Sequence, residues 1–211
     1  MLSSAAGRTS RLVRLFVAGP LPEALQARVA TALTAARRAA SQARWVRAEQ
    51  LHLTLAFLGE LDGTTQLPVL QQALQQLAPR HPAVQLWLKG AGCFGRPHQP
   101  DVLFAEVAGD MQGLGALHAD LQEALRPWLP PSAEAAGSAF RPHLTLARAR
   151  GRRGDPALRR CARALREQVL GGFLLERLVL FQSELAPSGA QHTRLAEFPL
   201  GSGAASQSAH P

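Results

Sequence analysis

Apolar and polar positions follow two different periods along the chain, and these periods predict alternating strands and helices. Short apolar or alternating runs are typical of strands, whereas apolar residues that recur about every three to four positions are typical of helices. The strands predicted in this way cover residues 12–18, 51–59, 84–92, 101–109, 142–149, 173–185 and 192–200. The predicted helices cover residues 22–40, 67–78, 111–129 and 155–170, and we expect Gly171 to stop the last of them.

The predicted elements repeat in the same order in the two halves of the chain. In each half a strand with a phenylalanine (Phe16 or Phe104) is followed by a helix, a strand that begins His-Leu-Thr-Leu-Ala, another helix and another strand. We therefore expect an α+β fold of two pseudo-symmetric lobes, with antiparallel sheets lining a central cleft and helices on the outside. One such bilobal domain would cover residues 11–200, between a disordered N-terminus (1–10) and a disordered tail (201–211).

The repeated His-x-Thr motif carries the candidate chemistry of the chain. It occurs in HLTLAFLG, which begins at His52, and in HLTLAR, which begins at His143. Side chains alternate between the two faces of a strand, so each histidine shares a face with the threonine two residues later, Thr54 or Thr145. The leucines between them lie on the other face and pack into the core. If the two strands lie side by side, two imidazoles and two hydroxyls converge on one cleft.

Such a set suits a displacement at phosphorus. One neutral imidazole can take a proton from the attacking water while the other, protonated, donates one to the departing oxygen, because the ordinary histidine pKa is about 6.5. Thr54 and Thr145 can donate hydrogen bonds to the non-bridging oxygens as charge builds there. Arg141 and Arg148 can clamp the same oxygens in a bidentate way. This chemistry needs no metal and no other cofactor.

Each of these residues also has a purely structural interpretation. A single histidine on an apolar strand is more often a packed residue than a catalyst, and threonine is a good strand former. Recurrence of the whole motif in a matching context favours function. Phe16 can stack a nucleobase or can simply pack in the core. A zinc site is disfavoured, because each motif supplies one ligand and has no carboxylate or thiolate nearby.

Composition and charge narrow the class of protein. The chain has 23 basic and 15 acidic residues, a formal net charge of +8, and a basic surface attracts phosphates at long range. A hydrophobic content of 46% indicates a globular chain, yet no apolar run approaches the roughly 20 residues of a membrane span. Cys93 and Cys161 have neither CxxC nor metal-site spacing, so we expect them to be reduced and buried, as in a cytoplasmic protein.

The motifs and their flanks resemble a known family. HLTLAFLG and RPHLTLAR are similar to the paired motifs of the 2H phosphoesterase superfamily. Within it, RLFVA at the first strand, the segment from Gly92 to Phe94 and the closing stretch LVLFQSELAPSGAQHTRLAEFPL resemble the RNA 2′,3′-cyclic phosphodiesterases. These are the LigT or ThpR proteins, once known as 2′-5′ RNA ligases.

The resemblance implies a function and roles for particular residues. It implies metal-independent opening of a 2′,3′-cyclic phosphate at an RNA end to leave a 2′-phosphate, so the partners would be such RNA ends or small cyclic nucleotides. It implies that His52 is the proton donor, His143 the proton acceptor and Arg148 a phosphate contact. The similarity of the two halves leaves the two histidine roles exchangeable on paper. We expect a monomer without membrane association.

Two positions depart from the family pattern, and three other functions stay open. His192 stands where the closing strand usually has an aromatic residue, often tyrosine, and Asp101 stands where a basic residue is usual. The same four active residues would serve a 2′-5′ RNA ligase or a phosphodiesterase of small cyclic nucleotides. A non-catalytic protein that binds RNA ends is the third alternative, but binding alone would not require paired proton donors and acceptors.

Overall fold

The computed structural model describes residues 12–130, 140–151, 153–186 and 189–201, so the termini that we expected to be disordered lie outside the described residues, apart from Gly201. The strands are β1 (Leu12–Pro20), β2 (Arg44–Trp45), β3 (His52–Asp62), β4 (Val84–Arg96), β5 (Gln99–Gly109), β6 (His143–Arg148), β7 (Val169–Leu175), β8 (Arg177–Ala186) and β9 (Gly189–Pro199). The α-helices are α1 (Glu23–Ala32), α2 (Thr34–Ala39), α3 (Gln66–Leu77), α4 (Met111–Leu125) and α6 (Pro156–Leu165). Three short 3-10 helices are η1 (Ala48–Gln50), η2 (Ala78–Arg80) and η3 (Arg126–Trp128).

The strands form two antiparallel sheets of matching order. The first sheet has the order β3-β1-β8-β9, and the second has the order β2-β6-β5-β4-β7. If the two-residue strand β2 is set aside, β6-β5-β4-β7 repeats the first order, with β6 in the place of β3 and β5 in the place of β1. Every pairing is antiparallel in both sheets. The predicted α+β fold of two pseudo-symmetric lobes is therefore confirmed.

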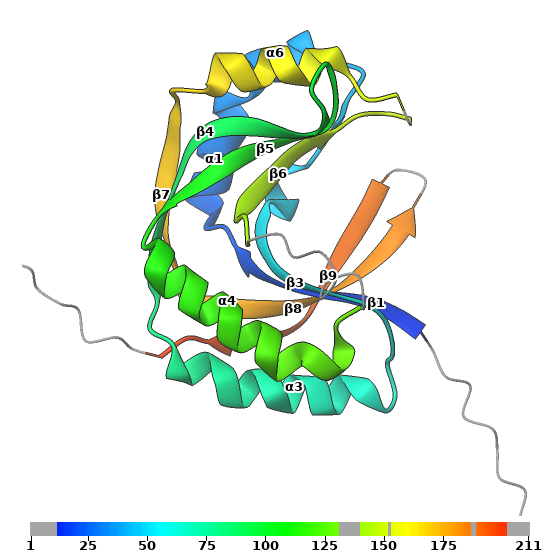
Figure 1. Cartoon of the computed structure of the whole chain (residues 1–211), viewed down its shortest axis with the longest axis vertical. Helices are drawn as coiled ribbons and strands as arrows, with labels where there is room; N and C mark the ends of the chain where they lie inside the picture. Colours follow the sequence, from blue (N-terminus) through cyan, green and yellow to red (C-terminus); the bar gives the residue numbers. More distant parts are fainter. Residues whose placement is uncertain (1–11, 131–139, 152, 187–188, 202–211) are drawn as a thin grey trace, which may run out of the picture.

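The helices cover the outer faces of the two sheets (Figure 1). α3 and α4 pack on each other and against β3 of the first sheet. α6 packs on β4 and β5 of the second sheet, with α1 against β7 and α2 against α6. Each lobe thus combines helices from both halves of the chain, which ties the two lobes into one domain. None of the helices within the described ranges is long and apolar enough to cross a membrane.

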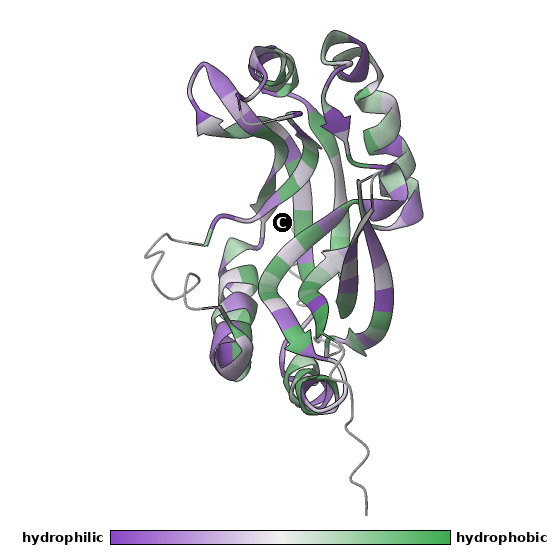
Figure 2. Ribbon diagram, turned by 90° about the vertical axis from the view of Figure 1, so that its right-hand side faces the viewer, coloured by the Kyte–Doolittle hydropathy of each residue, from purple (hydrophilic) through white to green (hydrophobic). Residues whose placement is uncertain are grey.

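The main hydrophobic core is continuous between the two lobes. Along the strands, apolar and polar positions alternate (Figure 2). This alternation directs apolar side chains to one face of each sheet. Leucines from both motif strands, Leu53 and Leu144, are fully buried in this core. A second, smaller cluster consists of Phe16, Ala18, Val179 and Phe181 and lies outside that core. The first sheet therefore has an apolar patch on the face that also carries His52.

The leucine behind each motif should hold its histidine at a fixed depth. Leu53→Ala or Leu144→Ala removes a fully buried side chain and leaves a cavity. We expect each change to lower the free energy of unfolding by about 2–5 kcal/mol, measured by urea denaturation. Leu12→Ala, at a leucine that is 62% exposed, is the control and should have little effect. Losses of equal size at Leu12 would contradict the assignment of the core.

Several predicted elements differ from the structure, three of them in where a helix or strand breaks or ends. The helix predicted over 22–40 breaks at Leu33 into α1 and α2. The helix predicted over 155–170 was too long, because α6 ends at Leu165 and β7 begins at Val169. The single strand predicted over 173–185 is divided at Glu176, so that its parts belong to different sheets.

Gly171 lies inside a strand, and its predicted role as a helix stop was wrong. It belongs to β7 and has a φ of +141°, a value that favours glycine. A Cβ at this position would lie 2.7 Å from Leu25 of α1, and one at Gly172 would lie 2.7 Å from the ring of Trp87. The glycine pair thus permits the close approach of α1 and Trp87 to β7.

Candidate active site

The two His-x-Thr strands have the same local geometry. In β3, Thr54 lies opposite Ala18 and Ala56 lies opposite Val17, so Leu55 is an extra residue. In β6, Leu146 is likewise an extra residue between the register positions of Thr145 and Ala147. Each motif therefore contains a β-bulge at the third residue after its histidine. A bulge changes which face the following residues occupy.

This bulge returns the fifth residue after each histidine to the exposed side. The burial pattern of HLTLA is the same in both strands: histidine and threonine are half-buried, and the leucines and alanine are buried. Phe57 and Arg148 follow at equivalent positions, and both are exposed. The predicted separation of histidine and threonine from the leucines is confirmed in both strands.

The structure brings the two motif strands together. β3 and β6 are in contact although they belong to different sheets. The positive charges of Arg148 and of protonated His143 both contribute to lowering the pKa of His52, so these groups lie within electrostatic range of its ring. This contact supports the predicted convergence of His52, His143 and Arg148, which stays a prediction.

The two imidazoles are anchored in the same way. Nδ1 of His52 lies 2.7 Å from the carbonyl oxygen of Gln50, and Nδ1 of His143 lies 2.8 Å from the carbonyl oxygen of Arg141. A carbonyl oxygen only accepts hydrogen bonds, so Nδ1 must donate in both rings. Nε2 is then the atom that carries the lone pair in the neutral ring. Each motif thus presents an Nε2 that can take up or release a proton.

Aromatic side chains hold the ring of His143 from one side. Its centroid lies 4.8 Å from that of Phe94 and 5.4 Å from that of Phe104, edge-on in both cases. The guanidinium of Arg141 lies 5.3 Å from the centroids of the same two rings, in cation–π geometry. The predicted role of Arg141 as a phosphate clamp stays a prediction, because its contacts here are with the aromatic rings that support His143.

His52 lies in a corresponding aromatic group on the first sheet. Its centroid lies 5.0 Å from Phe16, 5.9 Å from Phe181 and 5.4 Å from His192. Burial lowers the pKa of His52 to about 4, and the positive charges of His192, Arg148 and His143 add to this effect. His52 is therefore neutral in the unliganded protein near pH 7.

This lowered pKa makes protein stability depend on pH. An unfolded histidine titrates near 6.5, so His52 stabilises the fold fully above pH 6.5, and this stability is lost as the pH falls to about 4. The difference corresponds to about 3 kcal/mol. We expect the free energy of unfolding of His52→Gln to fall less steeply over this range than that of the wild type, measured by urea denaturation at several pH values.

Comparing the two proteins isolates His52 from the other histidines. Burial also lowers the pKa of His118 and of His192, and both contribute to the wild type and the variant alike. Parallel pH curves for the two proteins would contradict the buried, neutral state of His52.

Phe16 supports His52 rather than lying open to a ligand. It is 2% exposed, and its ring stacks on Phe181 at 5.1 Å. Of its two interpretations, this favours packing. The neighbouring Phe57, 6.0 Å from Phe16 between centroids, is 56% exposed and is the better surface for stacking. The sequence carried a signal for Phe57, which occupies the motif position that Arg148 has in the second copy.

The two threonines remain available to a ligand. Thr54 and Thr145 are half-buried on the same faces as the histidines. Among the residues that the structure describes, neither hydroxyl is hydrogen-bonded to a protein group. Both can therefore donate to an anion bound between the motif strands.

A small pocket lies beside His52. It has a volume of about 60 Å³ and is lined by Pro20, Gln26, Glu49, Gln50, Leu51, His52, Phe181, His192 and Arg194. Nδ1 of His192 is buried without a hydrogen-bond partner in the described part of the chain. Since water occupies about 30 Å³, the pocket has room for a group of one or two heavy atoms next to the imidazole. His192, which departs from the family pattern, thus belongs to the site.

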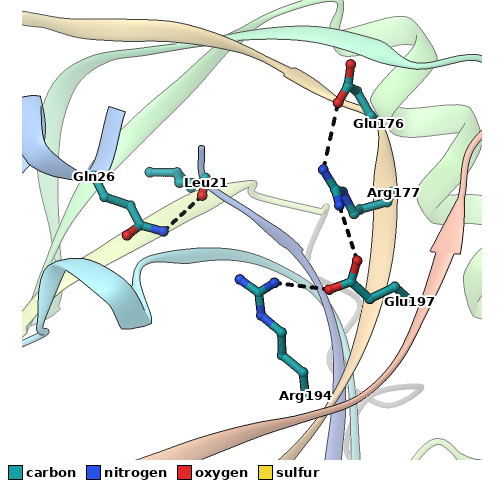
Figure 3. A network of polar contacts seen from close by, with 6 residues as sticks. All are labelled: Leu21, Gln26, Glu176, Arg177, Arg194 and Glu197. Atoms are coloured by element: carbon teal, nitrogen blue, oxygen red, sulfur yellow. Dashed lines mark hydrogen bonds and ion pairs between the residues drawn. The ribbon is translucent and has the colours of Figure 1, made fainter. Parts of the chain in front are cut away.

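Polar contacts hold two of the pocket residues in place (Figure 3). Arg194 pairs with Glu197 at 3.0 Å, and Glu197 pairs with Arg177 at 3.2 Å. The amide of Gln26 donates to the carbonyl oxygen of Leu21 at 2.9 Å. These contacts limit the freedom of Gln26 and Arg194 in the pocket wall.

Other site predictions have mixed outcomes. Cys93 and Cys161 are both free thiols, as expected, but only Cys161 is fully buried. Asp101 lies beside Gly95 near the end of the β4–β5 hairpin. Within the described ranges, no group of three or more His, Cys, Asp and Glu residues has an arrangement that could hold a metal ion.

Known proteins share both the sequence pattern and the fold. A family model described as the 2′-5′ RNA ligase superfamily matches residues 21–186. An RNA 2′,3′-cyclic phosphodiesterase of Thermus thermophilus is 34% identical over 201 residues, which cover 89% of this chain and 90% of that protein. The corresponding protein of Aeropyrum pernix is 32% identical over 153 residues, which cover 72% of this chain and 83% of that protein.

Solved structures agree with this assignment. The crystal structure of TT0787 of Thermus thermophilus matches with a TM-score of 0.74 and 30% identity, covering 90% of this chain and 98% of that one. E. coli LigT in complex with 3′-AMP matches with a TM-score of 0.63 and 26% identity, covering 90% and 99% of the two chains. The architecture is therefore that of the LigT-like phosphoesterases. The chain belongs to the 2′-5′ RNA ligase superfamily.

Proposed function

We propose that this protein is an RNA 2′,3′-cyclic phosphodiesterase that opens the cyclic phosphate at an RNA end and leaves a 2′-phosphate. The observation that carries the proposal is the matched pair of imidazoles, each with Nδ1 bound to a carbonyl oxygen two residues earlier. Relatives named for this activity, and a LigT structure with 3′-AMP, support the same substrate class.

The proposed reaction is an in-line displacement by water. Nε2 of His143 takes a proton from the water while the water oxygen bonds to phosphorus. The bond from phosphorus to the 3′ oxygen breaks, and Nε2 of His52 donates a proton to that oxygen. The products are a 3′-hydroxyl and a 2′-phosphate. Thr54 and Thr145 donate hydrogen bonds to the non-bridging oxygens, and Arg148 neutralises their charge.

His52 must take up its proton in the complex with substrate. It is neutral near pH 7 in the free protein, because burial lowers its pKa to about 4. The negative charge of a bound phosphate favours the protonated imidazole and raises this pKa. Substrate binding thus favours protonation of His52, the proposed general acid.

The pH dependence of turnover should report this titration. The dependence of kcat/KM follows the pKa values of the free enzyme. Because one of these groups is His52, we expect one limb of kcat/KM at about pH 4, well below the ordinary histidine value, and we expect this limb to move to higher pH in kcat. Initial rates after a rapid change of pH, on a 2′,3′-cyclic mononucleotide, would measure both. A kcat/KM profile without a limb near pH 4 would contradict the buried state of His52 in the working enzyme.

The nucleobase has a place on the first sheet. Phe57 is exposed next to Phe16, on the strand that carries His52. Aromatic side chains stack unpaired bases in a sequence-tolerant way. We therefore assign base stacking to Phe57 and give Phe16 the supporting position beneath His52.

The decisive experiment uses purified protein in EDTA. It should convert an RNA oligonucleotide with a 2′,3′-cyclic phosphate to the 2′-phosphate, identified by chromatography against 2′- and 3′-phosphate standards. A 3′-phosphate product, or binding without product, would overturn the proposal; the latter would leave a protein that binds RNA ends. The expected monomeric state and cytoplasmic location stay predictions.

A ligase reaction is the alternative within the same site, and the family name supports considering it. A 5′-hydroxyl of a second RNA would take the place of water in the displacement. Supplying an RNA with a free 5′-hydroxyl at high concentration and searching for a 2′-5′ linked product would separate the two reactions.

A further inference from the structure

A basic groove lies on the helix-covered side of the second sheet. It has a volume of about 520 Å³ between α6 and the end of β4. Its lining is Ala91, Cys93, Gly95, Arg96, Pro97, Arg159, Ala162, Arg163 and Arg166. Four guanidiniums therefore surround a hollow in which no lining residue is acidic.

Three of these arginines are not neutralised by the protein. Arg159 and Arg163 lie one turn apart on α6, and Arg166 is its C-cap residue, a spacing that brings like charges together and destabilises a helix. No ion pair joins any of the three to an acidic side chain in the part of the chain that the structure describes. Arg159 instead donates to Nδ1 of His98 at 2.9 Å. A bound anion would relieve the repulsion.

The backbone of β4 offers additional donors in the same groove. β4 pairs with β7 only as far as Lys89, so residues 91–96 have β5 as their strand neighbour on one side and none on the other among the described strands. In an antiparallel pair every second residue directs its N–H and C=O groups away from the partner strand. These groups lie along the same open edge as Ala91, Cys93 and Gly95, which line the hollow. Backbone N–H groups and arginines together are typical of phosphate contacts.

The groove is close to the catalytic residues along a single strand. The ring of Phe94 in β4 lies 4.8 Å from His143, whereas the adjacent Cys93 faces α6 and lines the groove. Arg96, another lining residue, is two positions further, a distance of about 7 Å along a strand. An RNA strand that leaves the active site past Phe94 can therefore reach the groove by passing around the end of the β4–β5 hairpin. The acidic residue Asp101 lies beside Gly95 at this end.

We propose that this groove binds the phosphate backbone of the RNA strand that leads to the reacting end. The inference rests on the proposed function and extends it: the preferred substrate is an oligonucleotide rather than a cyclic mononucleotide. Unpaired guanidiniums on a chain of net charge +8 favour RNA over an acidic protein, because arginine matches phosphate geometry and the contacts repeat along a strand.

The test compares two substrates of the same chemistry. One is a 2′,3′-cyclic mononucleotide and the other an oligonucleotide of about eight nucleotides with the same end, a length within the usual range of single-strand binding sites. The combined variant Arg159→Ala, Arg163→Ala and Arg166→Ala should lower kcat/KM for the oligonucleotide by about tenfold and leave the mononucleotide unaffected. The slope of log(kcat/KM) for the oligonucleotide against log salt should become shallower by about two, since each phosphate contact on a single strand contributes about 0.7.

The matched control removes three arginines elsewhere: Arg28→Ala, Arg80→Ala and Arg126→Ala. It changes the net charge by the same amount and should preserve the preference for the oligonucleotide. If both triple variants lose kcat/KM for the oligonucleotide equally, only the total charge matters, and the proposal that this groove binds RNA would be wrong. An unchanged kcat/KM for the oligonucleotide in the groove variant would also contradict this proposal.

A binding measurement separates this inference from the proposed function. Fluorescence anisotropy of a labelled octanucleotide with a 3′-phosphate, which cannot react, should show weaker binding to the groove variant than to the control. One outcome is that the wild type fails to open either cyclic substrate while the groove variant still binds the octanucleotide more weakly than the control. The proposed function would then be wrong, and the inference that the groove binds RNA would hold. If the groove variant keeps its RNA affinity but loses binding of a labelled polyglutamate peptide, the groove is a site for acidic protein segments and the inference is wrong.

Discussion

Replacing His52 or His143 with alanine should lower kcat on a 2′,3′-cyclic nucleotide by about 10²–10⁴-fold, because each change removes one of the two groups that we propose to transfer protons. The double variant should lose no more than roughly the larger single loss, since groups that act in one step are not additive. Single-turnover kinetics on a cyclic mononucleotide would measure kcat apart from binding.

The control for this result is His81→Ala. His81 is buried and pairs with Asp120, away from the motif strands, so its loss affects stability rather than chemistry. Circular dichroism would establish that each variant is folded before its rate is compared. If turnover persists in both the His52→Ala and the His143→Ala variants, the proposed two-histidine mechanism is wrong.

Removing the motif hydroxyls should give the second largest effect. Thr54→Val and Thr145→Val keep the shape of the side chain and delete the hydroxyl that we propose donates to the developing charge. We expect each to lower kcat by about 10²–10³-fold, as for other single donors of this kind, with a smaller change in KM. Steady-state kinetics on the cyclic mononucleotide would separate the two constants.

Serine serves as the matched control at both positions. Thr54→Ser and Thr145→Ser retain the hydroxyl and should recover most of the rate. If valine and serine variants lose activity equally, the threonines act through strand packing, and the proposed hydrogen bonds to phosphate would be wrong.

The local sequence predicted which side chains of a strand face the core, but not where each strand begins and ends. Alternation in HLTLA correctly separated His52 and Thr54 from the leucines behind them. Residues 169–170 read as the end of a helix because Val and Leu suit either structure, and only pairing with β4 decides between them. Gly171 was taken as a stop because the close approach of α1 to β7 is a contact between distant parts of the chain.

Site residues could be predicted where they belong to a sequence motif, but not where their position depends on contacts between distant parts of the chain. His143 and Arg148 belong to repeated or family motifs, so their positions could be read from the chain. Phe57 looked like one more apolar residue, because its exposure depends on a bulge that forms only when β3 pairs with β1. His192 could be recognised as a departure, but its place beside His52 depends on β8 and β9 folding back against β1.

The paired bulges bear on how a substrate is oriented. A scaffold with twofold pseudo-symmetry would, by itself, accept a molecule and the same molecule turned through half a revolution with equal energy. After each bulge, however, one half presents a phenyl ring at Phe57 and the other a guanidinium at Arg148. A ligand with a flat heterocycle at one end and an anion at the other then has one favourable direction in which to lie. This difference between two equivalent positions would distinguish the proposed donor half from the proposed acceptor half and would set the direction in which a substrate strand binds.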